Sequence, residues 1–434
     1  MNVAYGFWGI GILLLLLLLR VPVALALVAV SFGGIVALLG VTPALGILSG
    51  TPYDFVASWT LSAVPMFLLM GFVAYHSGLT GGLFAAAKLL LARVPGGLAV
   101  SSIFACSGFA AVSGSSLACA AAMGRIAIPE MVAAGYRPSI AAGCIAAGGT
   151  IGALVPPSIL MIIYGVFAET SITQVFLGGV SVGILTAVAY ALTVMLICFM
   201  RPDVIPRQGE IGERGDGRRA LIDVAPVIAL VALVLGGLFA GFFTATEAGA
   251  VGAAGAIVIA AVSGRLTWDV LTQSLTETLM ASAALFVIGV GAAMFTRFLG
   301  LSGLSGFISQ TVASADLSFW QLMVLIVVIY LLLGTFMEPF GALFITLPVL
   351  LPVVEAQGAS LVWFGVLVVK LLEVGMITPP VGMNVFIIRS VASKYVSLTQ
   401  IFAGVIPFIL ADIVVVALII AAPGIVLFLP RLLG

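Results

Sequence analysis

The sequence predicts an all-α polytopic membrane protein, arranged as an inverted repeat with two re-entrant helical hairpins. Its composition gives the first indication, because 63% of its 434 residues are hydrophobic and only 7% are charged, with a mean hydropathy of +1.35. A soluble domain carries about 25% charged residues. So little charge cannot cover a water-facing surface, and we therefore expect most of the chain to lie in a lipid bilayer. The other two indications are the spacing of its apolar segments and an internal repeat.

Apolar segments long enough to span a membrane, about 17–25 residues, recur along the whole chain. The first contains the run Gly9–Leu19, which we interpret as a retained membrane helix. Arg20 follows this run, whereas a signal peptide carries its positive charge before the apolar core. We expect crossings at 5–19 (short), 21–40, 54–77, 139–165, 174–200, 222–243, 247–263, 268–297, 360–388 and 398–429.

Two further apolar stretches, 98–135 and 318–357, are each interrupted half-way. Ser113–Ser116 divides the first stretch, and Glu338–Gly341 divides the second. Lipid cannot satisfy the backbone groups that such a break frees, so each tip must lie inside protein or beside a water-filled cavity. We therefore expect both stretches to form re-entrant hairpins.

The hydrophilic loop Arg201–Arg219 separates the two halves and contains five Arg residues against four acidic residues. Loops rich in positive charge stay on the cytoplasmic side, which assigns this loop to the cytoplasm. If 98–135 enters and leaves the membrane on one side, Lys88, Arg93 and Arg137 fall on the same cytoplasmic side. This agreement favours the hairpin and predicts an external N-terminus.

An internal repeat relates the two halves at an offset of 223 positions. We divide the chain into a first repeat at 1–200, a cytoplasmic linker at 201–221 and a second repeat at 222–434. Each repeat would contain five crossings and one hairpin, and an odd number of crossings inverts the second repeat. Inverted repeats with broken helices are typical of secondary transporters, whose site lies near the membrane midplane. The offset superposes Gly152-x3-Pro156-Pro157 on Gly375-x3-Pro379-Pro380, Pro129 on Pro352, and Gly135 on Gly358.

The first candidate site combines the tip of hairpin 98–135 with a break in helix 139–165. Two consecutive prolines remove two backbone donors and clash with earlier carbonyls, so Gly148–Gly152 cannot remain regular helix. Freed carbonyls and hydroxyls are neutral oxygen ligands that suit Na⁺, and half-helix N-termini favour an anionic group. The alternative is that these small residues only let helices pack closely. The Na⁺ candidates are Ser113, Ser115, Ser116, Gly148, Thr150 and Gly152, and the substrate candidates are Ser115, Pro156 and Ser158.

The second candidate site is the equivalent arrangement in hairpin 318–357 and broken helix 360–388. Glu338 would lie near membrane depth, where an ionisable group is costly and is therefore a functional candidate. It would bind a cation, carry a proton or cap the tip helix. The Na⁺ candidates are Glu338, Gly341, Gly375 and Thr378, and the substrate candidates are Pro379 and Asn384.

Two arginines are candidates for attracting the substrate anion, because a guanidinium offers two parallel N–H donors to a carboxylate. Arg125 lies on the returning limb of the first hairpin, and Arg389 follows the second Pro-Pro break. The alternative for Arg389 is that its charge extends to the membrane interface. For Lys370 we expect such an interfacial position, or an i, i+3 pair with Glu373.

Several function classes are excluded by composition and by missing motifs. A net charge of zero gives no basis for nucleic-acid binding. The four cysteines lie in apolar runs without CxxC spacing, which indicates buried apolar residues rather than disulfides or a zinc site. No GxSxG, HExxH or GxxxxGK[ST] motif is present, and His76 is the only histidine. We therefore predict neither an enzyme nor direct use of ATP.

These motifs resemble those of the large membrane subunit of tripartite ATP-independent periplasmic (TRAP) transporters. The resemblance covers essentially the whole chain and depends on an ordered set of stretches. They are Ser113-Gly114-Ser115-Ser116-Leu117-Ala118, Ile128-Pro129-Glu130-Met131-x3-Gly135-Tyr136, Gly148–Gly152 with Val155-Pro156-Pro157-Ser158, and Ile377-Thr378-Pro379-Pro380-Val381-Gly382-Met383-Asn384.

The resemblance implies an elevator-type carrier in the bacterial inner membrane, in which a transport domain with two hairpins slides against a scaffold held by a small membrane subunit. A periplasmic binding protein would deliver a carboxylate or sulfonate, and Na⁺ would drive its uptake. Two Na⁺ sites are implied, at Ser113–Ser116 with Gly148–Gly152 and at Glu338–Gly341 with Gly375–Pro379, with the substrate between the tips. The amphipathic stretch Leu83–Val94 would be an arm between scaffold and transport domain.

Two other hypotheses stay open. A stand-alone sodium–dicarboxylate symporter would share the paired hairpins and need no binding protein. An ion channel or an intramembrane enzyme belongs to another class: a channel would pass currents far above carrier turnover, and an enzyme would need a nucleophile–base pair. C4-dicarboxylates, sialic acids, other sugar acids and sulfonates are all candidate substrates.

Overall fold

The computed structural model describes residues 2–91, 93–205, 217–315 and 318–433. Helices are the only regular secondary structure in these ranges, which confirms the predicted all-α class. The helices of the first half are α1 Val3–Leu18, α2 Val23–Leu39, α3 Val41–Val56, η1 Trp59–Ser62, α4 Ala63–His76, η2 Leu79–Gly81, α5 Gly82–Leu91, α6 Gly97–Ser113, α7 Ser116–Ala133, α8 Pro138–Thr150, η3 Ile151–Ala153, α9 Ile159–Phe167 and α10 Ile172–Met200. Those of the second half are α11 Gly217–Phe239, α12 Ala245–Val262, α13 Trp268–Ser302, α14 Leu304–Ser314, α15 Phe319–Phe336, α16 Pro339–Ala356, α17 Leu361–Gly375, α18 Met383–Val391, α19 Leu398–Ala421 and α20 Gly424–Leu433.

Nine helical stretches within the described ranges are long and apolar enough to cross a membrane. Large apolar side chains such as Trp8, Phe242 and Trp268 are exposed on the surface of the protein. Water would disfavour so much exposed apolar surface, whereas lipid accepts it. The chain is therefore a multi-pass membrane protein.

Helix ends recur at the offset of 223 positions found in the sequence. α7 and α16 begin at Ser116 and Pro339 and end at Ala133 and Ala356, so that both ends are equivalent. A pair of helices, a broken helix and a long helix thus follow one another twice, as α6–α10 and as α15–α19.

The two helices that flank each polar break run side by side. In the first pair, the Ser102 Oγ near the start of α6 lies 4.0 Å from the Met131 Sδ near the end of α7. In the second pair, the Thr346 Oγ1 of α16 donates a hydrogen bond of 2.7 Å to the Tyr330 hydroxyl of α15. Each pair is therefore a helical hairpin.

Two predicted crossings are divided in the structure. The segment 54–77 begins inside α3, which the sequence did not indicate because its Gly, Pro, Ser and Thr residues favour a loop. Packing against α13 overrides this preference: the Arg297 Nη1 donates to the Thr51 Oγ1 at 2.9 Å, and its Nη2 lies 3.6 Å from the Asp54 Oδ2. The segment 398–429 is divided between α19 and α20 at Pro423, which cannot continue a helix.

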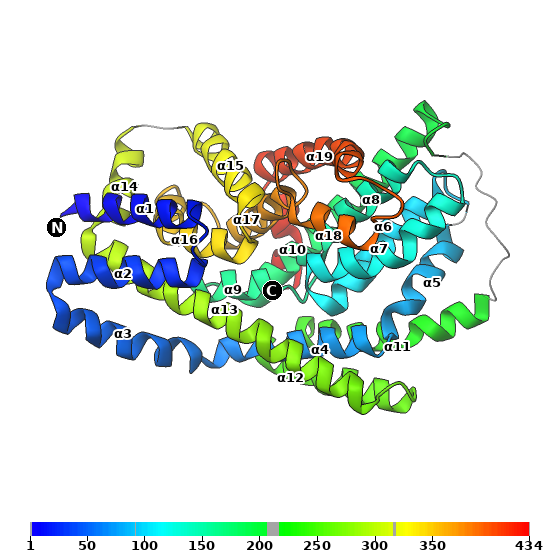
Figure 1. Cartoon of the computed structure of the whole chain (residues 1–434), viewed down its shortest axis with the longest axis horizontal. Helices are drawn as coiled ribbons and strands as arrows, with labels where there is room; N and C mark the ends of the chain where they lie inside the picture. The colour runs from blue at the N-terminus through cyan, green and yellow to red at the C-terminus, as the bar shows by residue number, and fades with distance from the viewer. Residues whose placement is uncertain (1, 92, 206–216, 316–317, 434) are drawn as a thin grey trace.

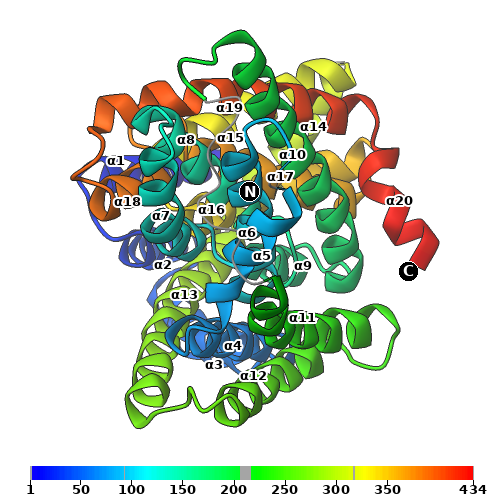
Figure 2. The same ribbon diagram turned by 90° about the vertical axis from the view of Figure 1, so that its right-hand side faces the viewer.

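Two views show that the helices form two groups. α3, α4, α11, α12 and α13 lie along one side, and we call them the wall helices (Figures 1 and 2). α6–α10 and α15–α19 form the other group, which we call the hairpin group (Figures 1 and 2). This division places both hairpins and both broken helices in one body.

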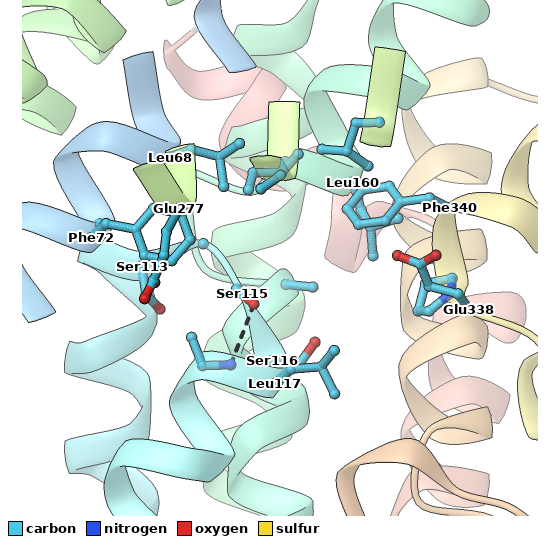
Figure 3. A pocket seen from close by; sticks show the side chains of 18 of the residues that line it. Leu68, Phe72, Ser113, Ser115, Ser116, Leu117, Leu160, Glu277, Glu338 and Phe340 are labelled. Carbon is cyan, nitrogen blue, oxygen red and sulfur yellow. Dashed lines mark hydrogen bonds between the residues drawn. The ribbon is translucent and has the colours of Figure 1, made fainter. Parts of the chain in front are cut away.

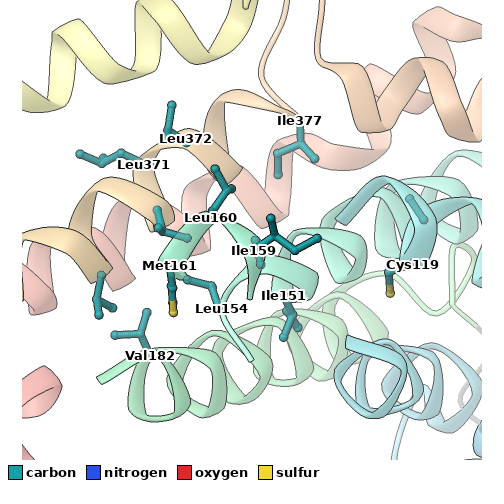
Figure 4. Close-up of a cluster of buried hydrophobic side chains, with 14 of the residues drawn as sticks. Cys119, Ile151, Leu154, Ile159, Leu160, Met161, Val182, Leu371, Leu372 and Ile377 are labelled. Atoms are coloured by element: carbon teal, nitrogen blue, oxygen red, sulfur yellow. The ribbon is translucent and has the colours of Figure 1, made fainter. Parts of the chain in front are cut away.

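The centre of the hairpin group is apolar. Ile159 and Leu160 of α9 lie near Leu371 and Leu372 of α17, so both broken helices contribute to one core (Figure 4). Within a bilayer such side chains stabilise the fold by close van der Waals packing rather than by removal from water. The four cysteines are buried, as the sequence predicts.

The turn between α7 and α8 lies beside the segment that follows α10. The Arg137 N–H donates to the Val204 carbonyl at 3.0 Å, and the Arg137 Nη2 lies 3.8 Å from the Asp203 Oδ2. Arg137 is thus at the same end of the molecule as the start of the loop 201–219. The middle of this loop and of the predicted linker, 206–216, lies outside the described residues, as does residue 92 of the predicted arm.

Candidate functional site

The tip of the first hairpin is a turn that requires glycine. α6 ends at Ser113, and Gly114 adopts a left-handed conformation with φ of +59°. Ser115 is the N-cap of α7, and its Oγ accepts the Ala118 N–H at 3.4 Å. A Cβ atom at position 114 would lie 2.3 Å from the Pro157 carbonyl oxygen. The tip therefore packs directly against the Pro-Pro break of the same half.

The first broken helix is interrupted later than the sequence predicts. α8 continues to Thr150, so Gly148 lies inside regular helix. Pro156 has no backbone N–H and clashes only with the carbonyl four residues earlier, at Gly152. The helix can therefore stay regular before that residue. Gly152 lies in η3, where a Cβ atom would lie 2.8 Å from the Ser116 Cα. The break and the first tip are thus in backbone contact.

The second tip is built differently from the first. α15 ends at Phe336, and Met337 is extended with φ of −121°. Glu338 occupies the N-cap position of α16, but its side chain makes no capping hydrogen bond to the described residues. The capping alternative is therefore not what this structure shows. Gly341 packs against α2, where an added Cβ would lie 3.3 Å from a Val23 methyl group.

The second broken helix meets the second hairpin backbone to backbone. α17 ends at Gly375, where an added Cβ would lie 2.6 Å from the Gly334 Cα of α15. The Thr378 Oγ1 donates to the Val374 carbonyl at 2.7 Å, so this hydroxyl is engaged within the break. α18 then begins after Gly382, which has a φ of +61°.

Two polar side chains join the halves at the second break. The Asn384 Nδ2 donates to the Ala146 carbonyl of α8 at 3.3 Å. At the first tip, the Ser116 Oγ donates to the Glu373 Oε1 of α17 at 2.8 Å. The other side-chain oxygens, Asn384 Oδ1 and Glu373 Oε2, are buried without a hydrogen-bond partner in the described part of the chain. The first tip and the second break therefore lie close together.

Both tips line one cavity of about 490 Å³ (Figure 3). Ser113–Ala118 and Glu338–Phe340 contribute to it, together with residues of α4 between 68 and 75 and of α13 between 277 and 288. Pockets for small molecules commonly measure about 300–1,000 Å³. The cavity is thus large enough for a small ligand, and it lies between the hairpin group and the wall helices.

The cavity brings together four of the predicted Na⁺ ligands, Ser113, Ser115, Ser116 and Glu338. The Ser113 Oγ is buried and has no hydrogen-bond partner among the residues that the structure describes. The predicted residues that do not line this cavity are Gly148, Thr150, Gly152, Gly341, Gly375 and Thr378 for Na⁺, and Arg125, Pro156, Ser158, Pro379, Asn384 and Arg389 for the substrate.

Neither predicted arginine lines the cavity. Arg125 is exposed on α7. The Arg389 Nη1 donates to the carbonyls of Ser393 and Val396, at 2.8 Å in each case. Arg389 therefore holds the backbone that follows α18.

A buried ion pair corrects the expectation for Lys370. The Lys370 ammonium binds Asp412 of α19, and both side chains are 0% exposed. Lys370 therefore does not reach the membrane interface, and its ion-pair partner is Asp412 rather than Glu373, because its helix is buried inside the protein. The Tyr190 hydroxyl donates to Asp412 at 2.8 Å and lies 3.2 Å from the Thr150 hydroxyl. This network joins α8, α10, α17 and α19.

Asp412 and Glu277 were not among the residues predicted from the sequence. Both are acidic residues in apolar helices, and an intramembrane charge is the signal that would have identified them. Glu277 lines the cavity from α13, together with Phe72 and Tyr75 of α4. The aromatic residues carry no comparable signal, because such side chains are common wherever helices pack.

Comparison with known proteins decides the family. The family described as "Tripartite ATP-independent periplasmic transporter, DctM component" matches residues 10–425. The chain belongs to this family. As a TRAP large permease subunit, it is similar to permeases rather than to enzymes.

Relatives within the TRAP family share about a third of its residues. The C4-dicarboxylate TRAP transporter large permease protein DctM of Pseudomonas aeruginosa is 31% identical over 410 residues, which cover 91% of this chain and 94% of that protein. The sialic acid TRAP transporter large permease protein SiaM of Vibrio cholerae is 33% identical, covering 86% of this chain and 87% of that protein. The isethionate TRAP transporter permease protein DctMQ of Oleidesulfovibrio alaskensis is 32% identical, covering 91% of this chain and 63% of that protein.

A solved structure shares the fold of this TRAP permease. The crystal structure of the YdaH transporter of Alcanivorax borkumensis superposes with a TM-score of 0.63 and covers 89% of each chain. Its sequence identity is 16%, so this likeness concerns the fold alone.

Proposed function

We propose that this TRAP permease couples the inward movement of Na⁺ to uptake of a small organic anion across the bacterial inner membrane, by an elevator mechanism. The observation that carries the proposal is the cavity to which both tips contribute, since a site between two halves can be exposed to either side in turn. The relatives are named for C4-dicarboxylates, isethionate and sialic acid, which are all small organic acids. Their names support an anionic substrate.

The proposed first Na⁺ site uses the first tip. The Ser113 Oγ is available as a ligand because it is buried without a hydrogen-bond partner in the described ranges. The proposed second site uses Glu338, whose carboxylate lines the cavity and is free of a capping bond within the described residues. Backbone carbonyls released where the helices break, after Thr150 and Gly375, would complete the oxygen donors that Na⁺ prefers.

The proposed elevator movement is a sliding of the hairpin group against the wall helices. The tips supply one side of the cavity and α4 and α13 supply the other, so such a movement would carry the site with the hairpin group. α5 would act as the arm, since its Lys88 Nζ lies 2.8 Å from the Glu130 Oε2 of α7. A small membrane subunit would hold the wall helices, and a periplasmic binding protein would deliver the substrate, as the tripartite periplasmic description of the family suggests.

Transport by the reconstituted system tests this function. The chain and its small subunit are placed in proteoliposomes, and uptake of radiolabelled succinate, isethionate and sialic acid is measured with a Na⁺ or a K⁺ gradient. We expect uptake of at least one of these acids that needs both the Na⁺ gradient and the binding protein. Ser115→Ala and Pro156→Ala should weaken Na⁺-dependent uptake while membrane insertion is unchanged.

The same assay separates the alternatives. Uptake that needs no binding protein would indicate a stand-alone symporter, and currents far above carrier turnover would indicate a channel. Glu338→Gln tests whether this carboxylate takes part in coupling. If the variant transports at an unchanged rate at every pH with Na⁺ alone, the carboxylate neither carries a proton nor binds the coupling cation.

A further inference from the structure

The charged side chains that line the cavity are acidic throughout its described lining. Two carboxylates line it, Glu277 of α13 and Glu338 of the second tip, and its described lining contains no Lys, Arg or His. A dicarboxylate or a sulfonate bound there would meet no cationic side chain. The Na⁺ proposed at Glu338 would compensate one carboxylate. The side chain of Glu277 is 47% exposed, and the described residue that can pair with it, His76, lies outside the lining of the cavity.

Glu277 lies in an aromatic environment. Phe72 and Tyr75, one turn apart on α4, line the same cavity, and Figure 3 shows Phe72 beside Glu277. His76 is not part of the lining, but it contacts Glu277 and both aromatic rings. Its ring centroid lies 6.4 Å from that of Phe72 and 5.0 Å from that of Tyr75, and its Nε2 lies 3.2 Å from the Glu277 Oε2. A carboxylate flanked by aromatic rings attracts an ammonium group, because its charge and the ring quadrupoles act together.

We propose that the transported substrate is a small zwitterion, whose ammonium group binds to Glu277, Phe72 and Tyr75. This inference rests on the proposed function and adds the chemical class of the substrate. A primary amine and a quaternary ammonium share the chemistry that these residues recognise, and the carboxylate or sulfonate of the substrate supplies the anionic character.

The acidic group of such a substrate has a binding position at the first tip. Ser116 and Leu117 are the first residues of α7, an 18-residue helix, and both line the cavity. The first N–H groups of a helix have no partner within the helix and carry the positive end of its dipole. In Figure 3 this tip lies between Glu277 and Glu338. The zwitterion would therefore extend from the start of α7 toward α4 and α13.

Isosteric probes isolate the contribution of the positive charge. Glycine betaine and tert-butylacetate have the same shape and the same carboxylate, and they differ only in the charge of the branched centre. Taurine and isethionate form a second pair, with an ammonium or a hydroxyl group beside a sulfonate. Binding of each probe to the purified permease with its small subunit is measured by isothermal titration calorimetry at constant Na⁺. We expect the ammonium member of at least one pair to bind about tenfold more tightly than its partner.

Matched variants connect this preference to the named residues. Glu277→Gln should reduce the preference to about twofold or less, whereas Glu355→Gln, at an exposed position of α16, should keep it. Phe72→Leu retains the apolar volume and should reduce the preference by about threefold, which also tests the proposal if the Glu277 variant does not fold.

The outcomes separate this inference from the function on which it rests. Equal binding within both pairs, including no binding of any probe, would overturn the zwitterion. A Glu277→Gln variant that kept the full preference would overturn it as well. If the binding preference is intact but uptake in proteoliposomes does not depend on the Na⁺ gradient, the result would instead count against Na⁺ coupling alone.

Discussion

The two broken helices occupy equivalent positions in the two halves, yet they differ in charge. α8 contains no charged residue, and its last turn ends at Thr150. α17 carries Lys370 and Glu373, and Glu373 occupies the position equivalent to Thr150 at the offset of 223. One copy of the duplicated element therefore offers a hydroxyl where the other offers a carboxylate.

This difference shows how one half supplies hydrogen bonds to acidic residues of the other. Glu373 of the second half accepts its hydrogen bond from Ser116 of the first, and Asp412 accepts one from Tyr190. Asp412 is also paired with Lys370, as a buried charge must be, because removal from water is costly. The duplicated halves are thus complementary rather than interchangeable, and their interface depends on a small number of polar contacts.

The largest effect is expected from breaking the buried ion pair. Lys370→Met would leave Asp412 enclosed without its cation, and the Tyr190 hydroxyl would be its remaining hydrogen-bond partner in the described part of the chain. Removal of one partner from a buried pair destabilises a protein by about 3–5 kcal/mol. The check is thermal unfolding of the purified protein in detergent.

The double variant Lys370→Met with Asp412→Leu is the control for that experiment. Because apolar residues of similar volume often replace a buried pair without loss, it should recover most of the stability. A double variant less stable than the single one would show that the pair contributes net stabilisation, contrary to this expectation.

A medium effect is expected at the first tip, where the two hairpins differ in backbone conformation. Gly114 is left-handed, whereas Met337 at the equivalent position is extended. Gly114→Ala adds a Cβ atom 2.3 Å from the Pro157 carbonyl oxygen. The added strain should destabilise by about 1–3 kcal/mol beyond the 1–2 kcal/mol of a left-handed alanine. Na⁺-dependent uptake should fall with it.

Gly358→Ala measures only the destabilisation that comes from placing alanine in a left-handed conformation. Gly358 also has a positive φ, of +68°, but nothing lies within 4 Å of an added Cβ. Its variant should therefore lose less thermal stability than Gly114→Ala and keep its uptake. Equal losses in the two variants would mean that the contact with Pro157 is unimportant.

Local signals predicted the helices and both tips, whereas the partners of the polar residues depend on three-dimensional packing. The breaks at Ser113–Ser116 and Glu338–Gly341 stand out because Ser, Gly, Glu and Pro interrupt long apolar runs. Nothing in the vicinity of Lys370 identifies Asp412, which lies two helices later along the chain. The i, i+3 spacing rule, which considers only near neighbours in the sequence, therefore selected Glu373 as the partner of Lys370. Arg389 likewise carries the same signal whether it binds an anion or, as here, backbone carbonyls.

The smallest effect is expected for the ion pair of the first half, which sharpens the contrast with Lys370. Lys88 of α5 and Glu130 of α7 are 2.8 Å apart, with side chains 27% and 44% exposed. Water and salt screen such a pair, so Lys88→Met should change stability by less than about 1 kcal/mol. Thermal unfolding at low and high salt checks this, with Lys370→Met measured alongside. Because this pair joins the proposed arm to the hairpin group, a normal unfolding temperature with slowed uptake would assign it to movement. A stability loss as large as that of Lys370→Met would contradict the assumption that exposure separates the two pairs.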